Sequence, residues 1–419
     1  MLTALGSYGD NGNKSFIRGE DVYKLLQGCY STLLDLLPDE PTVCLSEPSD
    51  RLPLTHRRLR QFVQSEFNLA EFGLRPGDRV GVLLPNGPEL AVTIMAVVSQ
   101  WCAAPINPTN TWQEIRAELQ STQARAIIIL AGAPANEAVL EAVKTLRVGV
   151  LVITPTGAAA GLFRLNSHTP TPEWDDVSSP KFMHTAAPST PLRVASIEMT
   201  PTPGSTQGPP ESQFFRTVIS PIATPPITVP LRASPAPSSS RGSRAVLLLH
   251  TSGTSGNKKL VPYTLDMVAV GAACIAASWG LSPSDVCLNM MPLFHIGGIM
   301  RNVFAPILAG GQTIACSGFD PLLFWDVAAS SSFTWYYAAP TMHHAILMEA
   351  ERRPRPLPVA SVRFIANAAG ALLPALAQAL QQNFVHSTIL TSYGMTEVPT
   401  TRPTHPARLE NIRISPINH

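Results

Sequence analysis

The chain has 419 residues, of which 45% are hydrophobic and 14% are charged, and its formal net charge at pH 7 is +1. A chain of this length is expected to bury a substantial core and to contain about two or three domains. The balanced charge excludes the strong electrostatic attraction on which binding to nucleic acid or to an anionic membrane depends, so neither partner is expected.

The cysteines and apolar stretches give no sign of secretion or membrane insertion. Six cysteines are scattered without a CxxC pair, which indicates reduced thiols rather than a disulfide or zinc framework. The first 20 residues hold charged side chains and no apolar block, and the longest apolar stretch, residues 90–106, is interrupted by Ser99 and Gln100. The last residues, INH, do not match an SKL-type peroxisomal signal. A cytoplasmic protein without a membrane span is therefore expected.

Strands and helices are predicted to alternate along two stretches of the chain. The first has strands expected at residues 41–46, 78–84, 103–106, 126–130 and 148–154, and helices at 21–37, 56–67, 88–101, 112–120 and 136–146. The second has strands expected at residues 245–249, 286–291, 312–316, 334–339, 362–367 and 387–392, and helices at 265–278, 299–308, 321–329, 342–351 and 374–383. Short apolar strands between helices are typical of parallel sheets covered on both faces, so an α/β fold with two subdomains is expected.

The composition changes between residues 167 and 243, where 15 of the 40 prolines lie. Such a stretch cannot bury enough apolar surface to offset the entropy of ordering it, so a disordered insertion rich in Pro, Ser and Thr is predicted. A regulatory linker and retained intron sequence are alternatives. The expected organisation is a first subdomain at residues 15–166, the insertion at 167–243, a second subdomain at 244–397 and an irregular tail at 398–419.

The segment HTSGTSGNKK, residues 250–259, has the chemistry of a phosphate-binding loop. Glycines let backbone N–H groups turn inward, hydroxyls add donors, and a lysine adds a mobile positive charge. It is not a Walker A loop, because Gly253 and Gly256 enclose two residues and Leu260 follows the last lysine. The alternative is a polar surface turn, but the buried-strand pattern before the segment favours nucleotide binding.

Several motifs, in this order, resemble those of the adenylate-forming superfamily, which includes acyl-CoA synthetases, luciferases and the adenylation domains of non-ribosomal peptide synthetases. Residues 250–259 resemble its phosphate loop, MPLFHIGG at 291–298 its acyl-pocket entrance, and TSYGMTE at 391–397 its adenine and magnesium motif. Residues 74–92 resemble the amino-terminal core, and the runs GFDPLLFWD and TWYYAAPTMHHAIL are most similar to fungal CoA-ligase-like members.

The resemblance implies two stacked α/β subdomains and a reaction between a small-molecule carboxylic acid and the α-phosphate of MgATP. Pyrophosphate leaves, and the acyl group is then transferred to the thiol of CoA or of phosphopantetheine, so a carrier protein is a possible partner. Positioning and charge stabilisation are expected to dominate the catalysis.

The resemblance also assigns roles to individual residues. Those expected to hold the β- and γ-phosphates are Thr251, Ser252, Gly253, Thr254, Ser255, Gly256 and Lys259. Tyr393 is expected to stack on adenine against the backbone of Ala369, Gly370 and Ala371. Thr396 is expected to donate to the α-phosphate, Glu397 to bind Mg²⁺, and His295 to lie near the substrate carboxylate. The expected catalytic residues are thus Thr254, Lys259, His295, Thr396 and Glu397.

Some of these roles have alternatives. A Thr-Glu pair also caps helix starts, and a lone His beside an apolar run is often structural. His343 and His344 are adjacent on an expected helix, so they point to different faces, and no third metal ligand is evident. Both are therefore expected to be structural. The small, apolar residues expected to line the acyl pocket favour an aliphatic or aryl acid.

The family continues beyond its adenine and magnesium motif through a β-rich subdomain and a mobile carboxy-terminal domain, whereas 22 residues follow Glu397 here. No lysine follows Lys259, so the family's carboxy-terminal catalytic lysine has no counterpart. The chain is therefore expected to be a truncated ligase with impaired turnover. A catalytically silent nucleotide- or acyl-binding module is the alternative.

Overall fold

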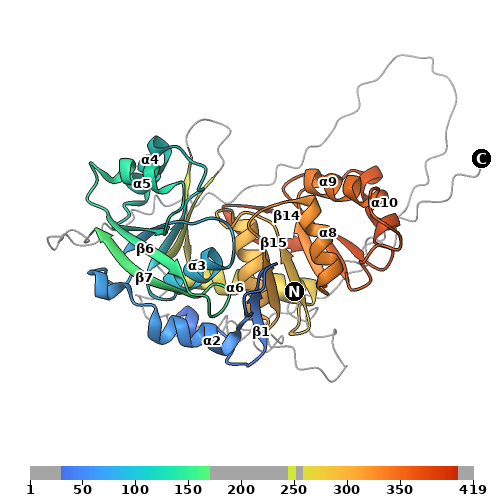
Figure 1. Cartoon of the computed structure of the whole chain (residues 1–419), viewed down its shortest axis with the longest axis horizontal. Helices are drawn as coiled ribbons and strands as arrows, with labels where there is room; N and C mark the ends of the chain where they lie inside the picture. The colour runs from blue at the N-terminus through green and yellow to red at the C-terminus, as the bar shows by residue number, and fades with distance from the viewer. Residues whose placement is uncertain (1–29, 170–243, 252–257, 404–419) are drawn as a thin grey trace, which may run out of the picture. The chain divides into compact units, whose positions relative to one another are not determined.

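A computed structural model describes residues 30–169, 244–251 and 258–403 of the chain. These residues form two mostly parallel β-sheets with helices packed on them, which confirms the expected α/β class (Figure 1). Of the helix expected at residues 21–37, the described part contains a short 3-10 helix, η2 (Leu33–Asp35).

The first sheet has eight strands among the described residues, in the spatial order β15-β14-β13-β12-β10-β11-β1-β2. Its central strands run parallel, while β2 and β15 at its two ends pair antiparallel with their neighbours. The strands are β1 (Val43–Ser46), β2 (Leu54–Thr55), β10 (Val286–Asn289), β11 (Gln312–Ala315), β12 (Trp335–Ala338), β13 (Phe364–Asn367), β14 (Thr388–Met395) and β15 (Val398–Pro403).

The second sheet has seven described strands in the order β7-β6-β5-β3-β4-β8-β9. It too is parallel in the middle and antiparallel at both ends. The strands are β3 (Arg79–Leu83), β4 (Cys102–Pro105), β5 (Ala126–Leu130), β6 (Gly149–Pro155), β7 (Phe163–Thr169), β8 (Ala245–His250) and β9 (Leu260–Thr264).

The two sheets exchange strands across the boundary that the sequence placed at residue 244. Strands β1 and β2 pair with the sheet built from residues beyond 285, and β8 and β9 pair with the sheet built from residues before 170. The segments 15–166 and 244–397 are therefore not separate sheet-forming units. The apolar pattern of a buried strand predicts that it is buried but does not specify which neighbour it pairs with.

The helices cover the faces of the sheets in layers (Figure 1). Helices α4 and α5 pack on one face of the seven-stranded sheet, helices α8, α9 and α10 on one face of the eight-stranded sheet, and α3 and α6 contribute to the large core that includes the remaining faces. Successive side chains of β12 alternate between the cores, as a strand requires: Tyr336 faces α8, and Trp335 and Tyr337 face α6. The α-helices are α2 (His56–Gln61), α3 (Pro88–Gln100), α4 (Trp112–Thr122), α5 (Asn136–Val143), α6 (Leu265–Trp279), α7 (Ala305–Leu308), α8 (Pro321–Ser330), α9 (Pro340–Ala350) and α10 (Pro374–Asn383).

Short polar side chains begin several of these helices. Thr55 accepts a hydrogen bond from the backbone N–H of Arg58 at the start of α2, and Thr111 forms a capping box with Glu114 at the start of α4. Such caps satisfy N–H groups that have no partner within the helix. Three further short helices are the π-helices η3 (Phe62–Glu66) and η5 (Gly297–Phe304) and the 3-10 helix η4 (Leu69–Phe72).

Three strands lie where the sequence analysis predicted none. Strand β7 extends to Thr169, which is within the expected insertion at residues 167–243. The remaining residues of that segment, 170–243, lie outside the described part of the chain. Strand β9 lies between the predicted phosphate loop and the predicted helix at 265–278, where no strand was predicted. Strand β15 begins the expected irregular tail, of which residues 404–419 are not described.

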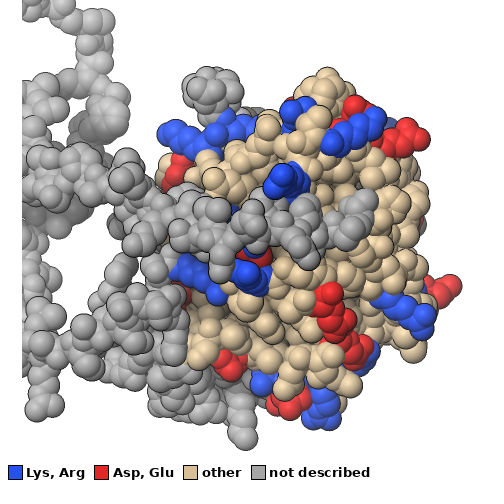
Figure 2. Space-filling model, turned by 90° about the vertical axis from the view of Figure 1, so that its left-hand side faces the viewer, with Lys and Arg blue, Asp and Glu red and all other residues tan. Residues whose placement is uncertain are grey.

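The surface in Figure 2 carries basic and acidic side chains interspersed among a majority of other residues. In the part of the chain that the structure describes, no helix has the length and apolar character needed to cross a membrane.

Candidate functional site

The carboxyl ends of four neighbouring parallel strands meet at one edge of the eight-stranded sheet. Strands β10, β12, β13 and β14 lie side by side, with Ala338 in register with Asn367, and Asn367 in register with Thr391. In open α/β sheets, ligands bind outside the carboxyl ends of the strands. The segments that follow these strands contain His295, residues 369–371 and the Thr396–Glu397 pair, so the topology brings these predicted site residues to one edge.

The predicted phosphate loop joins two antiparallel strands, because His250 at the end of β8 pairs with Leu260 at the start of β9. The backbone N–H of Thr251 donates to the carbonyl oxygen of Lys259 at 2.9 Å, and the N–H of Lys259 donates to Oγ1 of Thr251 at 3.1 Å. Thr251 and Lys259 thus close the base of the loop. The predicted loop residues Ser252, Gly253, Thr254, Ser255 and Gly256 lie outside the described residues.

The two lysines of the loop differ in their surroundings. The ammonium group of Lys258 lies 2.8 Å from Oε1 of Glu118, a carboxylate on α4 whose side chain is 10% exposed. Asn110 donates to the same carboxylate at 3.1 Å. Lys259 is exposed, and its ammonium group has no hydrogen bond or ion pair with any residue in the described ranges. Lys259 is therefore the lysine that remains available to an incoming anion.

Tyr263 connects the phosphate hairpin to the Thr396–Glu397 turn. Its side chain is fully buried, and its hydroxyl donates to the backbone carbonyl of Thr396. Burial raises the pKa of Tyr263, and the negative charge of Glu397 raises it further. Tyr263 lies on β9, which begins directly after Lys259. The chain from Lys259 to Tyr263 therefore spans at most roughly 13 Å, and one tyrosine side chain bridges the rest of the way to the Thr396 carbonyl. The strand that follows Lys259 is therefore in contact with the Thr396–Glu397 turn.

The turn that carries His295 is held by a residue that the sequence did not single out. The side-chain amide of Asn86, in the turn before α3, donates to the carbonyl oxygens of Met291 at 3.2 Å and Cys316 at 3.0 Å, and its Oδ1 accepts from the N–H of Leu293 at 3.0 Å. These three bonds connect the start of α3 to the carboxyl ends of β10 and β11. An asparagine between Pro and Gly is typical of any turn, so its sequence gave no sign of this role.

His295 itself is exposed, and its ring lies 4.6 Å from that of Phe294, centroid to centroid. Partial burial of the imidazole lowers the pKa of His295. The backbone after it is tightly packed, because a Cβ on Gly298 would lie 2.3 Å from the carbonyl oxygen of Pro292. The glycine therefore lets the chain fold back on itself and present His295 at the strand ends.

The segment expected to contact adenine contains a strained residue. Ala369 has φ = 60°, in the left-handed region that costs a residue with a Cβ about 1–2 kcal/mol. Residues 369–371 are exposed, and the buried side-chain amide of Asn367 donates to the carbonyl oxygen of Gly370 at 3.1 Å. Oδ1 of Asn367 is enclosed without a hydrogen-bond partner. Strain of this kind is often retained at ligand-binding sites.

Three predicted residues complete the edge. Thr396 is half-buried and Glu397 is exposed, in the connection between β14 and β15. The backbone of Tyr393 pairs with Arg402 in these strands, and the placement of its side chain is not described.

The other two histidines considered in the sequence are on α9. His343 is fully buried, with Nδ1 3.3 Å from the hydroxyl of Tyr336, and burial lowers its pKa to about 4. His344 is exposed. The described residues contain no cluster of three or more His, Cys, Asp or Glu side chains that could hold a metal ion, so neither histidine belongs to one.

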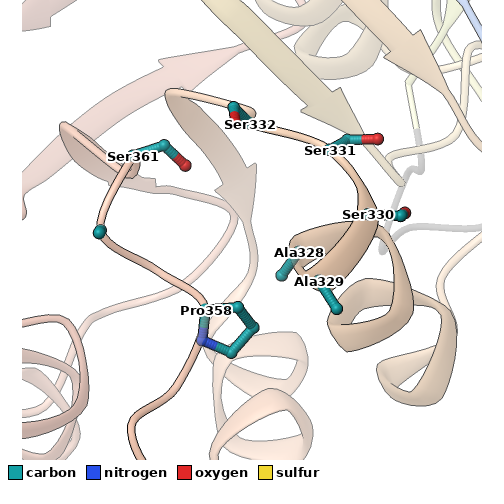
Figure 3. A pocket seen from close by; sticks show the side chains of 8 residues that line it. Ala328, Ala329, Ser330, Ser331, Ser332, Pro358 and Ser361 are labelled. Carbon is teal, nitrogen blue, oxygen red and sulfur yellow. The ribbon is translucent and has the colours of Figure 1, made fainter.

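A pocket of about 330 Å³ lies elsewhere, between the end of α8 and the segment before β13 (Figure 3). Its walls precede the amino ends of β12 and β13, at the edge opposite to the predicted residues. Small side chains line it and none is charged, so it offers little chemistry. The lining residues are Ala328, Ala329, Ser330, Ser331, Ser332, Pro358, Ala360 and Ser361.

Comparison with known proteins identifies the family. A family model described as AMP-binding enzyme matches residues 55–412. An oxalate–CoA ligase of Arabidopsis thaliana is 24% identical over 377 residues, which cover 89% of this chain and 60% of the relative. An oxalate–CoA ligase of Saccharomyces cerevisiae is 33% identical over 161 residues, which cover 38% of this chain and 29% of the relative.

A solved structure shares the fold. The long-chain-fatty-acid–CoA ligase FadD1 of Archaeoglobus fulgidus superposes with a TM-score of 0.64 at 17% sequence identity, over 91% of this chain and 67% of that one. The chain spans less than two thirds of the length of either oxalate–CoA ligase. The family model, in contrast, covers most of the chain, and the motifs on which the resemblance rested lie within it. This protein belongs to the AMP-binding enzyme family, the adenylate-forming enzymes that its motifs resemble.

Proposed function

We propose that this chain binds MgATP and a small carboxylic acid and joins them as an acyl-adenylate, the first step of acid–thiol ligation. The observation that carries the proposal is the hydrogen bond from Tyr263 to Thr396. It brings the strand that begins beside Lys259 next to the turn that carries Glu397. In this proposal the ammonium group of Lys259 and the carboxylate of Glu397, both exposed, would act on the same nucleotide.

The charges at this edge suit a magnesium-bound triphosphate. Lys259, with the N–H groups and hydroxyls of residues 251–256, would hold the β- and γ-phosphates. Thr396 would donate to the α-phosphate. Because no cluster of three acidic or imidazole side chains is present in the described ranges, Glu397 would bind Mg²⁺ together with phosphate oxygens and water, as is common for this cation.

The nucleoside has a matching surface. The exposed backbone of residues 369–371 follows β13, adjacent to β14, and Tyr393 lies on β14 itself. We assign the adenine to this segment, with the ring of Tyr393 stacked on it. The strain at Ala369 supports this assignment because it holds the backbone in a conformation that the sequence alone does not favour.

The chemistry of the step is displacement at phosphorus. A carboxylate oxygen of the acid bonds to the α-phosphorus as the bond to the bridging oxygen of pyrophosphate breaks, and the resulting mixed anhydride is a reactive acyl donor. The protein supplies position and charge. His295, exposed at the strand ends and largely neutral at pH 7 because its pKa is lowered, would donate or accept a hydrogen bond at the substrate carboxylate.

The proposal also names the class of the carboxylic acid and the thiol that accepts the acyl group. The segments expected to line the acyl pocket, residues 299–304, 336–339 and 367–372, contain mostly small or apolar residues, which favours an aliphatic or aryl acid. Two relatives are named for the short acid oxalate. The names of those relatives support CoA as the acceptor thiol. Phosphopantetheine on a carrier protein is the other acceptor that this chemistry allows.

Exchange of labelled pyrophosphate into ATP, measured over a panel of carboxylic acids, tests the proposal. We expect acid-dependent exchange that falls by at least about a hundredfold in Glu397→Ala, because the displacement loses a magnesium ligand. Glu351→Ala is the matched control, since Glu351 is an exposed glutamate at the end of α9. Tight binding of ATP without exchange for any acid would instead support a catalytically silent nucleotide-binding module.

A further inference from the structure

Arg301 is a buried cation without a counter-ion. It lies in the π-helix η5 and is 5% exposed. Its guanidinium group makes no hydrogen bond or ion pair with any residue of the described ranges, and its Nε is fully enclosed. Burial lowers the pKa of Arg301, but a guanidinium remains protonated in proteins. A buried charge is costly when it is unpaired, so the arrangement is incomplete without an anion.

The guanidinium lies beside two features of the candidate site. Its Cζ is 5.1 Å from the centre of the Tyr337 ring, in a cation–π contact. A Cβ added to Gly297 would lie 3.3 Å from Nη1 of Arg301 and 3.1 Å from the hydroxyl of Tyr337. The guanidinium and the hydroxyl therefore converge over Gly297, two residues beyond His295.

The groups at this point are donors with unused capacity. The hydroxyl of Tyr337 makes no hydrogen bond to a described residue, and neither do the terminal nitrogens of Arg301. The Tyr337 hydroxyl and the terminal nitrogens of Arg301 are not fully enclosed, in contrast to Nε of Arg301, so solvent reaches them. Burial keeps the phenol protonated by raising the pKa of Tyr337. Two adjacent donors, one of them charged, suit an oxyanion.

The backbone that carries Arg301 is fixed by its neighbour. The side-chain amide of Asn302 donates to Oδ1 of Asn289 at 2.7 Å, and the hydroxyl of Thr313 donates to the carbonyl oxygen of Asn302 at 2.6 Å. These bonds tie η5 to the end of β10 and to Thr313 within β11. The backbone that carries Arg301 is therefore held in place before a ligand arrives, which lowers the entropy lost on binding. Single π-helical turns are also frequent at functional sites.

We propose that Arg301 and the hydroxyl of Tyr337 bind a second anionic group of the substrate, so that the preferred acid carries two anions, only one of which is activated. The proposal rests on the proposed function and adds to it a substrate class: short dicarboxylic acids or sulfocarboxylic acids. One anion reaches the phosphate edge near His295, and the other neutralises Arg301. A monocarboxylic acid of the same length leaves Arg301 unpaired.

The experiment compares matched acids and matched variants in the full chain. Pyrophosphate exchange is measured with malonate against propionate, succinate against butyrate, and sulfoacetate against propionate. For the unmodified chain we expect kcat/KM at least about tenfold higher for the dianionic member of one or more pairs, the usual size of a hydrogen-bonded charge pair. Arg301→Met should bring that ratio close to one, and Arg301→Lys should keep part of it. Arg352→Met, at an exposed arginine of the far helix end, should keep all of it.

A second measurement does not depend on turnover. The preferred dianion, added at saturating concentration with MgATP, should raise the urea midpoint of the unmodified chain and leave that of Arg301→Met unchanged. Without ligand, Arg301→Met should be at least as stable as the unmodified chain, since it replaces an unpaired buried charge with an apolar side chain of similar length. A purely structural arginine would give the opposite sign.

The outcomes separate the two proposals. If kcat/KM of the unmodified chain is about the same for the dianionic and the monoanionic acid of every pair, the role of Arg301 is overturned. It is also overturned if Arg301→Met leaves the ratio of the two kcat/KM values unchanged, even when both values fall. Exchange with no acid at all counts against the proposed function, and the urea measurement then decides the dianion site. If Arg301→Met does not fold, Arg301→Lys and Tyr337→Phe provide the comparison. A ratio that persists in both variants rejects the site.

Discussion

The two adjacent lysines of the phosphate hairpin, replaced one at a time, should affect different properties of the protein. Lys258 is paired with the nearly buried Glu118 at 2.8 Å, whereas Lys259 has no partner in the described part of the chain. We therefore expect Lys258→Ala to change stability and Lys259→Ala to change nucleotide binding. Each variant is the matched control of the other, because the two residues have the same side chain and neighbouring positions.

The structure gives the size of each effect. Lys258→Ala leaves the carboxylate of Glu118, 10% exposed, with the amide of Asn110 as its remaining strong donor. Because the Lys258 side chain is 44% exposed, solvent screens the pair, and we expect a loss of about 1 kcal/mol in the free energy of unfolding. Lys259→Ala removes one charge-assisted contact with phosphate, about 1.5–3 kcal/mol, or roughly ten- to a hundredfold in the Kd of MgATP.

Two titrations at a fixed ionic strength of about 0.15 M check these values, since surface charges are screened by salt. Urea unfolding gives the stability change, and calorimetric titration with MgATP gives the Kd. We expect Lys258→Ala to change the Kd by less than about threefold and Lys259→Ala to change stability by less than about 0.5 kcal/mol. Equal weakening of MgATP by both substitutions, or a stability loss confined to Lys259→Ala, would refute the assignment.

Two further predictions concern the packing around the site. Gly298→Ala should lower the free energy of unfolding by about 1–3 kcal/mol and reduce pyrophosphate exchange, because its Cβ would lie 2.3 Å from the carbonyl oxygen of Pro292. Gly318→Ala is the control, since no atom lies within 4 Å of the added Cβ. Equal urea midpoints for the two variants would contradict the predicted crowding at Gly298. His343 is neutral when folded, with a pKa near 4 against an ordinary value of 6.5, so the unfolded chain binds more protons between these pH values. Its contribution to stability should therefore fall as pH decreases from about 6.5 to 4, by at most about 1.4 kcal/mol per pH unit, and urea titrations should show a flatter pH dependence for His343→Gln but not for the exposed His344→Gln.

The alternation of strands and helices was predictable because each central strand is a short apolar run buried on both faces. The edge strands β7 and β9 were missed for a related reason. Strand β7, FRLNSHT, has one solvated face and no apolar run, and β9 contains Pro262, which resembles a break in sequence. Proline is accommodated in β9 because this strand lies at the edge of its sheet, where one row of N–H groups needs no partner.

The sequence indicates candidate site residues where they form a local motif, and not where their role depends on a contact between distant residues. The motifs containing Lys259 and Glu397 stand out as clusters of polar residues after apolar strands. Asn86 and Arg301, in contrast, belong to ordinary sequence contexts. The role of Asn86 rests on bonds to residues more than 200 positions away, and that of Arg301 on the absence of an acidic neighbour among the described residues.

The exchange of strands gives the candidate site its physical basis. Strand β9 belongs to one sheet and the Thr396–Glu397 turn to the other, and the bond from Tyr263 joins them through a fully buried side chain. A triphosphate that contacts Lys259 and a magnesium ion on Glu397 would therefore touch both sheets at once. Residues of both sheets also belong to one hydrophobic core. In the proposed function, this shared core would hold Lys259 and Glu397 on opposite sides of the nucleotide, as electrostatic stabilisation of the displacement at phosphorus requires.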